Sequence, residues 1–418
     1  MDMPDNTYER LLEETRTKRC IVFGCGKYFE EFALRYPAII GKVDFILDNG
    51  RGRDKYVYNG LSIPIIKPEE IKKFRDMKYI IVFCAVRWRE MKNQLDEIIG
   101  CDYSHFHYPI DVDYRRNKEL GISHRIILPT VRILREHSMV MKALEFTGTK
   151  SEGELIERLK RKEIHALPRL VVVLTPKCTM RCKECNNLMP VFLKKASGGG
   201  HNDLEVERIM ASLRNIIESL DFISCVELIG GEPFVARNLG KVLGFLLEQE
   251  KVLTVEITTN GTIIPQEEIL GQLKNSKVAV HISDYGSVMD QSKFLECMRQ
   301  NAIQFKTLEL QGRWVSTGGI EARNRDGEEL VRQYYRCSSG YLCKTLWEDK
   351  IYPCARAASL AELGIMQDCP NISGLDKEGL RERLYSFYVV PSCGVCDYCD
   401  MSTENPVYVE PAVQMEMQ

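Results

Sequence analysis

The 418-residue sequence lacks an excess of charge of either sign, because 57 Lys and Arg residues are balanced by 59 Asp and Glu residues. A near-neutral chain has no electrostatic footprint for nucleic acid or for an anionic membrane surface, so we expect neither as a partner. The sequence also lacks an apolar stretch close to the roughly 18 residues of a membrane span. Its charged beginning, MDMPDNTYERLLEETRTKR, has no apolar segment of the kind found in signal peptides. These absences predict a cytoplasmic protein.

Cysteine, by contrast, is abundant, with 16 residues. In a reducing cytoplasm these thiols are not expected to form disulfides, and their clustering favours metal ligation or redox chemistry. Three cysteines lie within residues 178–185, and seven lie between residues 337 and 399, six of which are candidate ligands. At roughly 150 residues per domain, the length predicts two or three domains. We therefore expect two thiol sites in one multidomain chain.

Residues 1–115 alternate between short apolar runs and helical patterns, which predicts an α/β domain with a parallel, doubly wound sheet. The run RCIVFG leads into Gly24 and Gly26, and a second run ends in Asp48, where a dinucleotide-binding unit places the acid that binds a ribose. The place of the third glycine is taken by Phe29. The domain is therefore Rossmann-like, and two interpretations stay open: it binds a nucleotide, or it has none. It resembles the degenerate nucleotide-binding modules appended to sugar-nucleotide and polysaccharide-modifying enzymes.

The rest of the chain divides into three predicted parts. Residues 116–165 are charged and prone to form helices, so we interpret them as a helical connector. In residues 166–330, strands recur at a spacing of about 30 residues with helices between them, which favours a (β/α) barrel or part of one. Residues 331–418 carry the second group of cysteines and predict a small, cysteine-rich C-terminal domain.

The first cysteine group, CTMRCKEC, directly follows the apolar run LVVVLT. Cys178, Cys182 and Cys185 in one loop can hold three irons of a cubane and leave the fourth iron open. Zinc is the alternative, but a structural zinc site normally takes four protein ligands, and the nearest histidine is His201. Buried structural cysteines are a further alternative, which the polar residues between the thiols disfavour.

The C-x-x-x-C-x-x-C loop after a strand, followed by GGEP at residues 230–233, resembles the radical S-adenosylmethionine (radical SAM) superfamily. The resemblance covers about residues 168–330. It implies a partial (β/α)6 barrel and a 4Fe-4S cluster whose open iron chelates S-adenosylmethionine. It also implies reductive cleavage of that cofactor to a 5′-deoxyadenosyl radical, which abstracts hydrogen from the substrate. A flavodoxin- or ferredoxin-type protein would then supply the electron.

The resemblance also assigns residues around the cofactor. The cofactor's amino group would meet the backbone at Gly230, Gly231, Glu232 and Pro233, and its ribose would meet Asn260 and Ser283. One position departs from the family pattern, because Glu184 stands where an aromatic residue near the adenine is common.

Two further side chains share a strand face with these cofactor residues. The segment TVEITTNGT has a period of two, which places Glu256 on the same face as Asn260 and directs it into the barrel. Glu256 is either a catalytic group that binds substrate or takes a proton, or the ion-pair partner of an inward Lys or Arg. His281 shares its face with Ser283 and is either a catalytic residue or a core histidine.

The second cysteine group resembles the twitch or SPASM extension of radical SAM enzymes, in which a hairpin ending in YPC and a later C-x-x-C hold an auxiliary iron–sulfur cluster. The resemblance is partial, because Asp349 replaces the usual glycine and the seven-cysteine SPASM set is absent. We predict one four-ligand cluster, of the 4Fe-4S type, with zinc as the alternative metal. The predicted ligands are Cys343, Cys354, Cys396 and Cys399, with Cys337 and Cys393 as substitutes.

An auxiliary cluster can accept the electron that a substrate radical loses, which completes an oxidation. A free thiol can instead donate hydrogen and give epimerisation. The candidates for this role are whichever of Cys337 and Cys393 is unligated, together with Cys225 and Cys297, for which a buried inert thiol is the alternative. The leading prediction is therefore a radical SAM oxidoreductase acting on a small molecule, a sugar or sugar nucleotide. The alternatives are a radical SAM epimerase, a peptide- or protein-modifying enzyme, and a non-catalytic zinc-binding protein.

Overall fold

The structure is a computed structural model that describes residues 7–415, except residues 51–53, 59–60, 75–76, 86–87, 109–122, 196–203, 310–313, 368, 391 and 404–405. His201, the nearest histidine to the first cysteine group, lies outside the described residues. The chain forms two compact units, residues 1–120 and 121–418. Both are built on largely parallel sheets, so the predicted α/β class is confirmed. No described helix combines the length and the apolar character needed to cross a membrane.

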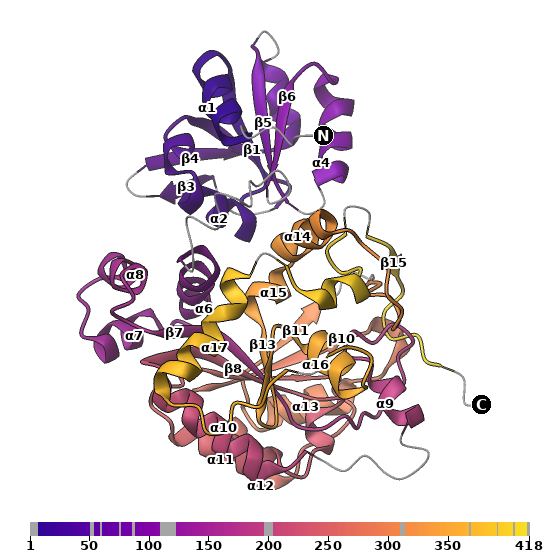
Figure 1. Cartoon of the computed structure of the whole chain (residues 1–418). Coiled ribbons are helices and arrows are strands. Elements are labelled where there is room, and N and C mark those ends of the chain that lie inside the picture. Colours follow the sequence, from indigo (N-terminus) through magenta and orange to yellow (C-terminus); the bar gives the residue numbers. More distant parts are fainter. Residues whose placement is uncertain are drawn as a thin grey trace. The chain divides into compact units, whose positions relative to one another are not determined.

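The first unit contains one six-stranded sheet, ordered β3-β4-β2-β1-β5-β6 (Figure 1). All its pairings are parallel except that of β3 with β4. The strands are β1 (Arg19–Phe23), β2 (Val43–Leu47), β3 (Lys55–Tyr58), β4 (Leu61–Ile66), β5 (Tyr79–Cys84) and β6 (Ser104–Tyr108). The helices are α1 (Thr7–Thr17), α2 (Lys27–Arg35), α3 (Pro37–Ile40), η1 (Pro68–Phe74) and α4 (Trp88–Ile99). Its central strands, β1 and β5, are almost completely buried because helices cover both faces.

The loop after β1 contains Gly24, and its backbone is hydrogen-bonded to Asp48, the acid that the sequence predicted to bind a ribose. Gly24 has φ +99°, and a Cβ there would lie 3.2 Å from the carbonyl oxygen of Cys84, so glycine is required. The Asp48 carboxylate accepts hydrogen bonds from the backbone N–H groups of Cys25 (2.9 Å) and Gly50 (2.6 Å). Phe29 is fully buried in the core. These contacts explain the structural roles of Asp48 and Phe29 but do not test whether the unit binds a nucleotide, which stays a prediction.

The second unit contains a seven-stranded sheet, ordered β11-β10-β9-β8-β7-β13-β14. Strands β7 to β11 follow the chain order and pair in parallel, β13 adds in parallel at the other edge of β7, and β14 closes the sheet as an antiparallel hairpin partner. The strands are β7 (Ala166–Val173), β8 (Phe222–Ile229), β9 (Val255–Thr259), β10 (Val278–Asp284), β11 (Phe305–Glu309), β13 (Lys344–Trp347) and β14 (Lys350–Tyr352). The β13–β14 hairpin thus extends the central sheet.

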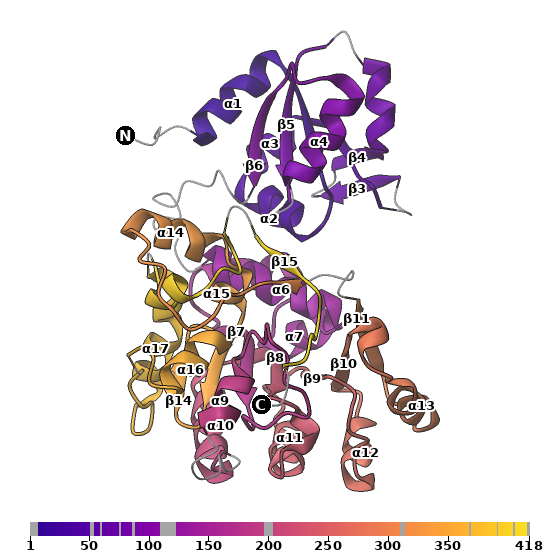
Figure 2. The same ribbon diagram turned by 90° about the vertical axis from the view of Figure 1, so that its right-hand side faces the viewer.

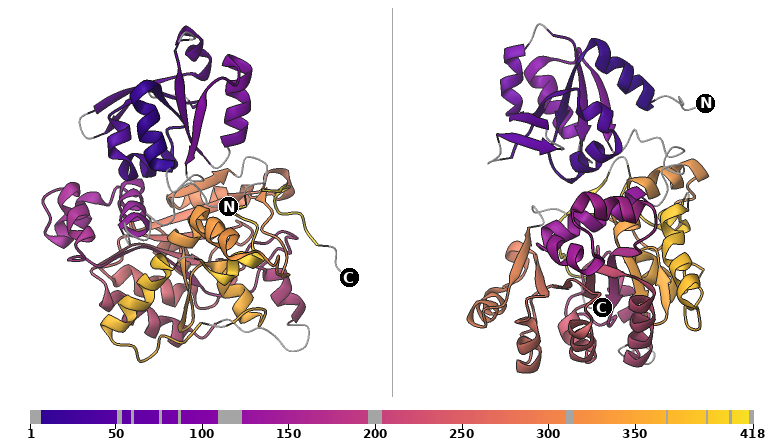
Figure 3. Two further views of the ribbon diagram at one scale, coloured as in Figure 1. Left: turned by 45° about the horizontal axis from the view of Figure 1, so that its top comes forward. Right: turned by 90° about the vertical axis from the view of Figure 1, so that its left-hand side faces the viewer.

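Helices α10, α11, α12 and α13 lie along one side of this sheet (Figure 2), and α17 packs beside α10. Figure 3 shows the same unit from two further directions. The helices are η2 (Ser123–Ile127), α6 (Leu128–Glu136), α7 (Val140–Thr147), α8 (Glu152–Lys160), α9 (Met189–Lys195), α10 (Val206–Ser219), η4 (Pro233–Val235), α11 (Leu239–Glu248), α12 (Glu267–Leu273), η5 (Gly286–Val288), α13 (Ser292–Gln300), α14 (Gly327–Arg336), α15 (Ser338–Leu342), α16 (Ala355–Glu362), α17 (Lys377–Val389) and η6 (Gly394–Tyr398). A two-stranded sheet pairs β12 (Trp314–Val315) with β15 (Tyr408–Val409).

Asp349, which replaces the usual glycine, lies in the turn between β13 and β14. Its carboxylate forms an ion pair with Arg208 of α10 (2.7 Å) and accepts a hydrogen bond from Asn371. The substitution therefore ties the hairpin turn to the helices that flank the sheet.

Candidate functional site

The first cysteine loop and the predicted cofactor residues come together at one edge of the second sheet. Cys178 follows β7, Gly230 and Gly231 follow β8, Asn260 follows β9, and Ser283 lies near the end of β10. The carboxyl ends of neighbouring parallel strands meet at the same edge of a sheet, which is where α/β proteins place their chemistry.

The two glycines of GGEP allow the loop after β8 to pack directly on the cysteine loop. A Cβ on Gly230 would lie 2.7 Å from the Thr175 carbonyl oxygen, and one on Gly231 would lie 2.2 Å from the Lys177 carbonyl oxygen and 2.7 Å from Cys178 Cβ. The Gly231 N–H donates to the Thr175 carbonyl at 2.9 Å. A side chain at Gly231 would therefore displace the backbone that carries Cys178.

Glu232 fixes the ends of β8 and β9 together. Its side chain is completely buried, and it accepts hydrogen bonds from Thr259 Oγ1 (2.8 Å), from the Asn260 N–H (2.8 Å) and from the Phe234 N–H (3.1 Å). Burial raises the pKa of this carboxyl above its usual value, although the hydrogen bonds oppose the shift. The side chain thus holds the loop in place, and the backbone of GGEP faces the cysteine loop.

Asn260 connects the end of β9 to the first cysteine. Its Nδ2 lies 3.7 Å from Cys178 Sγ and donates to Thr179 Oγ1 at 3.1 Å. Gln291, which the sequence analysis missed, donates from Nε2 to the backbone carbonyls of both Asn260 (2.7 Å) and Ser283 (2.8 Å). The two predicted ribose residues are therefore held side by side through one buried amide.

Cys178, Cys182 and Cys185 lie in one partly apolar cluster and interact electrostatically with one another. Burial raises the pKa of each thiol, that of Cys178 to about 12. Tyr285, a second residue missed by the sequence analysis, has a phenol that interacts with all three thiols, and its ring meets Trp314 edge to face at 5.6 Å. A bound metal cluster would stabilise the thiolate form of these desolvated thiols.

The last described residues of the chain cover the same loop. Cys182 forms an antiparallel bridge with Gln414. The Gln414 side chain accepts from the Arg181 N–H (2.7 Å) and places its Nε2 3.4 Å from Cys182 Sγ. The Lys183 N–H donates to the Val413 carbonyl at 2.8 Å, and Ala412 is fully buried. No local sequence pattern marks this contact, because the partners are more than 200 residues apart.

Glu256 lies in a buried polar network nearer the amino ends of the strands. Its carboxylate pairs with Arg169, where Nη2 to Oε1 is 3.1 Å, and with His137 at 2.6 Å, while His281 Nδ1 lies 3.5 Å away. Arg169 also binds Glu227 at 2.8 Å. Of the two interpretations of Glu256, the ion pair with an inward Lys or Arg is therefore present, with Arg169 as the partner.

The network sets the protonation of both candidates. Burial alone would raise the pKa of Glu256, but the hydrogen bond with His137 and the charge of Arg169 outweigh it and lower the pKa to about 2. Burial lowers the pKa of His281, and the charge of Glu256 opposes that shift only in part. At neutral pH Glu256 is therefore ionised, and His281 is mainly neutral.

Four of the six candidate C-terminal thiols line one small cavity: Cys337, Cys354, Cys396 and Cys399. Cys343 does not line it, and its thiol interacts with Glu227 and Arg169 of the buried network as well as with Cys337. Cys393 does not line the cavity, although its carbonyl accepts the Cys396 N–H at 2.9 Å.

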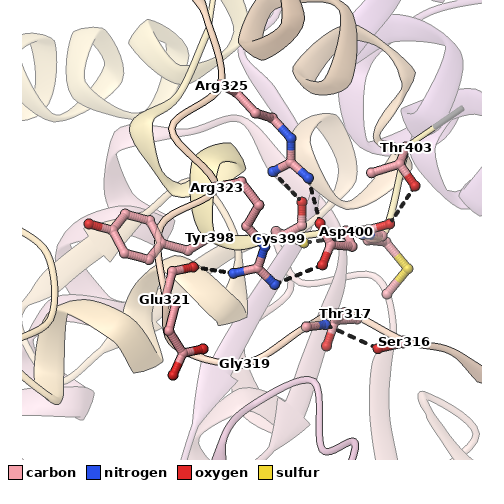
Figure 4. Close-up of polar contacts among 12 residues, drawn as sticks. Ser316, Thr317, Gly319, Glu321, Arg323, Arg325, Tyr398, Cys399, Asp400 and Thr403 are labelled. Atoms are coloured by element: carbon pink, nitrogen blue, oxygen red, sulfur yellow. Dashed lines mark hydrogen bonds and ion pairs between the residues drawn. The ribbon is translucent and has the colours of Figure 1, made fainter. Parts of the chain in front are cut away.

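Arginines hold the loop that carries the last two of these cysteines (Figure 4). Arg325 donates to the carbonyls of Cys396 (2.6 Å) and Cys399 (3.0 Å) and forms an ion pair with Asp400. Arg323 binds the other oxygen of Asp400 at 2.7 Å. These contacts fix the backbone on which the thiols are mounted.

Comparison with known proteins identifies the segment that carries the first site. Residues 172–283 match the family model of the Radical SAM superfamily.

Individual proteins match the chain more weakly. A GTP 3′,8-cyclase of Syntrophomonas wolfei is 25% identical over 165 residues, which is 38% of this chain and 48% of that protein. The chain thus matches about half the length of this relative. BtrN in complex with AdoMet and 2-DOIA has a TM-score of 0.39 and 15% identity, over 58% of this chain and 97% of BtrN. SuiB of Streptococcus suis bound to S-adenosylmethionine has a TM-score of 0.33 and 15% identity, over 57% of this chain and 67% of SuiB.

Arg356 joins the radical SAM segment to the second thiol group. It is 2% exposed, and its guanidinium donates to the carbonyls of Asn186 (3.2 Å), next to Cys185, and of Tyr398 (3.1 Å), next to Cys399. It also interacts electrostatically with Cys185 and Cys399 themselves. One buried side chain therefore sets the separation of the two cysteine loops, which neither motif indicated.

The match to the Radical SAM family model implies a 4Fe-4S cluster and S-adenosylmethionine, and the residues at the first site fit both. Three buried or half-buried thiols lie together, and two glycines bring a backbone loop against them. Among the described residues, no group of three His, Cys, Asp or Glu side chains is arranged to bind a single metal ion. The second site fits a thiolate-bound group because four thiols from three segments of the chain line one cavity.

Proposed function

We propose that this protein is a radical SAM oxidoreductase that removes hydrogen from a sugar or sugar nucleotide and passes the second electron to an auxiliary iron–sulfur cluster. The observation that carries the proposal is the second thiol cavity, connected through Arg356 to the loop of the radical SAM segment. When bound, the first cluster and S-adenosylmethionine supply a 5′-deoxyadenosyl radical. A flavodoxin- or ferredoxin-type donor supplies the first electron.

The chain's own residues position these groups. Cys178, Cys182 and Cys185 hold the first cluster. The GGEP backbone receives the amino end of S-adenosylmethionine, and Asn260 and Ser283 receive its ribose, at strand ends clamped by Glu232 and Gln291. Tyr285 and Trp314 supply the aromatic surface that Glu184 does not.

For the auxiliary cluster we propose the ligands Cys337, Cys354, Cys396 and Cys399. This set differs from the sequence prediction at one position, because Cys337 lines the cavity and Cys343 does not. Cys393 remains the substitute, since its backbone bonds to Cys396 within the same loop.

A cavity of about 480 Å³ is the best candidate for the substrate site. It adjoins both cysteine loops, because Ser316 in its wall donates to Glu184 at 2.8 Å, while Gln333 and Ser402 also line the small thiol cavity. Its polar lining includes Arg332 and Arg336. Arg325, Glu329 and Asp400 also line it, so the arginines exceed the carboxylates by one. A polar lining of this kind favours a hydroxyl-rich small molecule such as a sugar or sugar nucleotide.

Epimerisation is the second candidate function, and the position of Cys343 favours it. This thiol lies outside the cavity of the proposed ligands and interacts with Glu227 and Arg169 within the sheet's polar network. A thiol that no cluster engages is able to return hydrogen to a substrate radical.

Iron and sulfide content after anaerobic reconstitution tests the proposal. We expect about eight irons per chain in the wild type and about four in the C178A/C182A/C185A variant, from two cubanes of four irons each. A C354A/C396A/C399A variant should also retain about four, and C343A, the matched control, about eight. Wild-type protein should convert S-adenosylmethionine to 5′-deoxyadenosine. About four irons in the wild type and none in the first variant would remove the electron acceptor and favour epimerisation.

A further inference from the structure

Arg125 is a buried cation with no anionic partner among the described residues. It is 9% exposed, and neither Nη atom has a hydrogen-bond partner among the described residues. Its guanidinium lies over the ring of Tyr335, 4.0 Å from the centroid, and over that of Tyr334, at 4.8 Å. Arginine stays protonated in proteins, and an uncompensated buried charge is strongly destabilising. The two aromatic rings offset only part of this cost.

Lys344 is a second buried basic side chain in the same place, and its burial and the nearby charge of Arg125 lower its pKa to about 7. It is fully buried, and its Nζ donates to the Gly340 carbonyl, lies 3.5 Å from the Pro353 carbonyl and lies 4.2 Å from the ring centroid of Tyr388. It interacts unfavourably with Arg125. Within the described part of the chain neither side chain forms an ion pair with a carboxylate, so no acid balances the charge of Arg125 or favours the charged form of Lys344.

Both side chains border the small cavity of the second thiol group. Tyr334, on which Arg125 lies, lines that cavity, and so do Gly340 and Pro353, the two residues whose carbonyls contact Lys344. The thiols of Cys337 and Cys354 interact electrostatically with Lys344. The anion that would balance the charge of Arg125 and favour the charged form of Lys344 therefore belongs in this cavity.

A cubane bound by four thiolates has this charge. Its net charge is negative and becomes more negative by one unit when it accepts an electron, with no bond made or broken. Fixed cations nearby stabilise both states and stabilise the reduced state more, so they raise the reduction potential.

We propose that Arg125 and Lys344 are positioning residues for the auxiliary cluster, where they balance its charge and raise its reduction potential so that it accepts an electron. The inference rests on the proposed function, because it requires a cluster at Cys337, Cys354, Cys396 and Cys399. It adds to that function a pair of residues that belong to neither cysteine motif.

Redox titration of the auxiliary cluster alone tests the inference. The full-length C178A/C182A/C185A variant, reconstituted anaerobically, is titrated with dithionite through mediators and followed by electron paramagnetic resonance. Adding R125M or K344M to this variant should lower the midpoint potential by at least 59 mV. For one electron, this shift is a tenfold change in the reduction equilibrium.

Two further variants separate charge from packing. R125K, which keeps the cation, should retain a midpoint close to that of the parent. K277M, which removes a lysine whose Nζ contacts the backbone carbonyls at the C-terminal end of α11 (2.6–3.3 Å), should leave the midpoint unchanged. If R125M does not fold, K344M and R125K still give the comparison.

The outcomes distinguish the two proposals. No iron in the parent triple variant would overturn the auxiliary cluster and this inference together. An iron-loaded parent whose midpoint is unaffected by R125M and K344M, or is lowered equally by R125K, would overturn this inference alone.

Discussion

At the scale of the residue, Gly231 is the position of the first site where an added side chain is tolerated least. A Cβ there would lie 2.2 Å from the Lys177 carbonyl oxygen, and the neighbouring atoms belong to the backbone, so the cysteine loop itself must move. We expect G231A to lose at least tenfold in 5′-deoxyadenosine formation and to retain less iron at the first site, because the thiols would no longer converge. Gly271 of α12 is a matched control, since a Cβ there meets nothing within 4 Å. G271A should keep its iron and gain roughly 1 kcal/mol from helix propensity. Wild-type turnover by G231A would contradict the close-packing argument.

At the scale of the element, the segment of residues 412–415 protects the loop on which it lies, through the bridge between Gln414 and Cys182. Deleting residues 412–418 should expose the first cluster and speed the loss of its visible absorbance in air, whereas deleting residues 416–418 alone, the matched control, should not. Equal rates would show that the bridge does not shield the loop. The sequence could predict the strand ends that form the site, because a period of two and the cysteine and GGEP motifs are local patterns. It could not predict Gln291 or Gln414, because a single polar residue gives no periodic signal and its partners lie in distant segments. It placed Cys343 among the ligands by spacing, yet the three-dimensional path of the chain brings Cys337 to the cavity instead.

At the scale of the whole molecule, the chain consists of two compact units, each with its own sheet and core, so its unfolding need not be a single transition. Glu256 stabilises only the second unit. Its pKa falls from 4.5 to about 2 because its interactions with His137 and Arg169 outweigh the effect of burial. Such a group stabilises the fold fully above its unfolded pKa, and this contribution disappears as the pH falls from about 4.5 to about 2. At neutral pH it amounts to about 3 kcal/mol. Calorimetry of E256Q should therefore show a lower melting temperature for one transition at pH 7, and the difference from wild type should shrink below pH 4.5. E248Q, at the exposed end of α11, is the control and should match wild type at both pH values. A destabilisation of E256Q that stayed constant down to pH 2 would mean that packing of the side chain, and not its charge, stabilises the interior of the sheet.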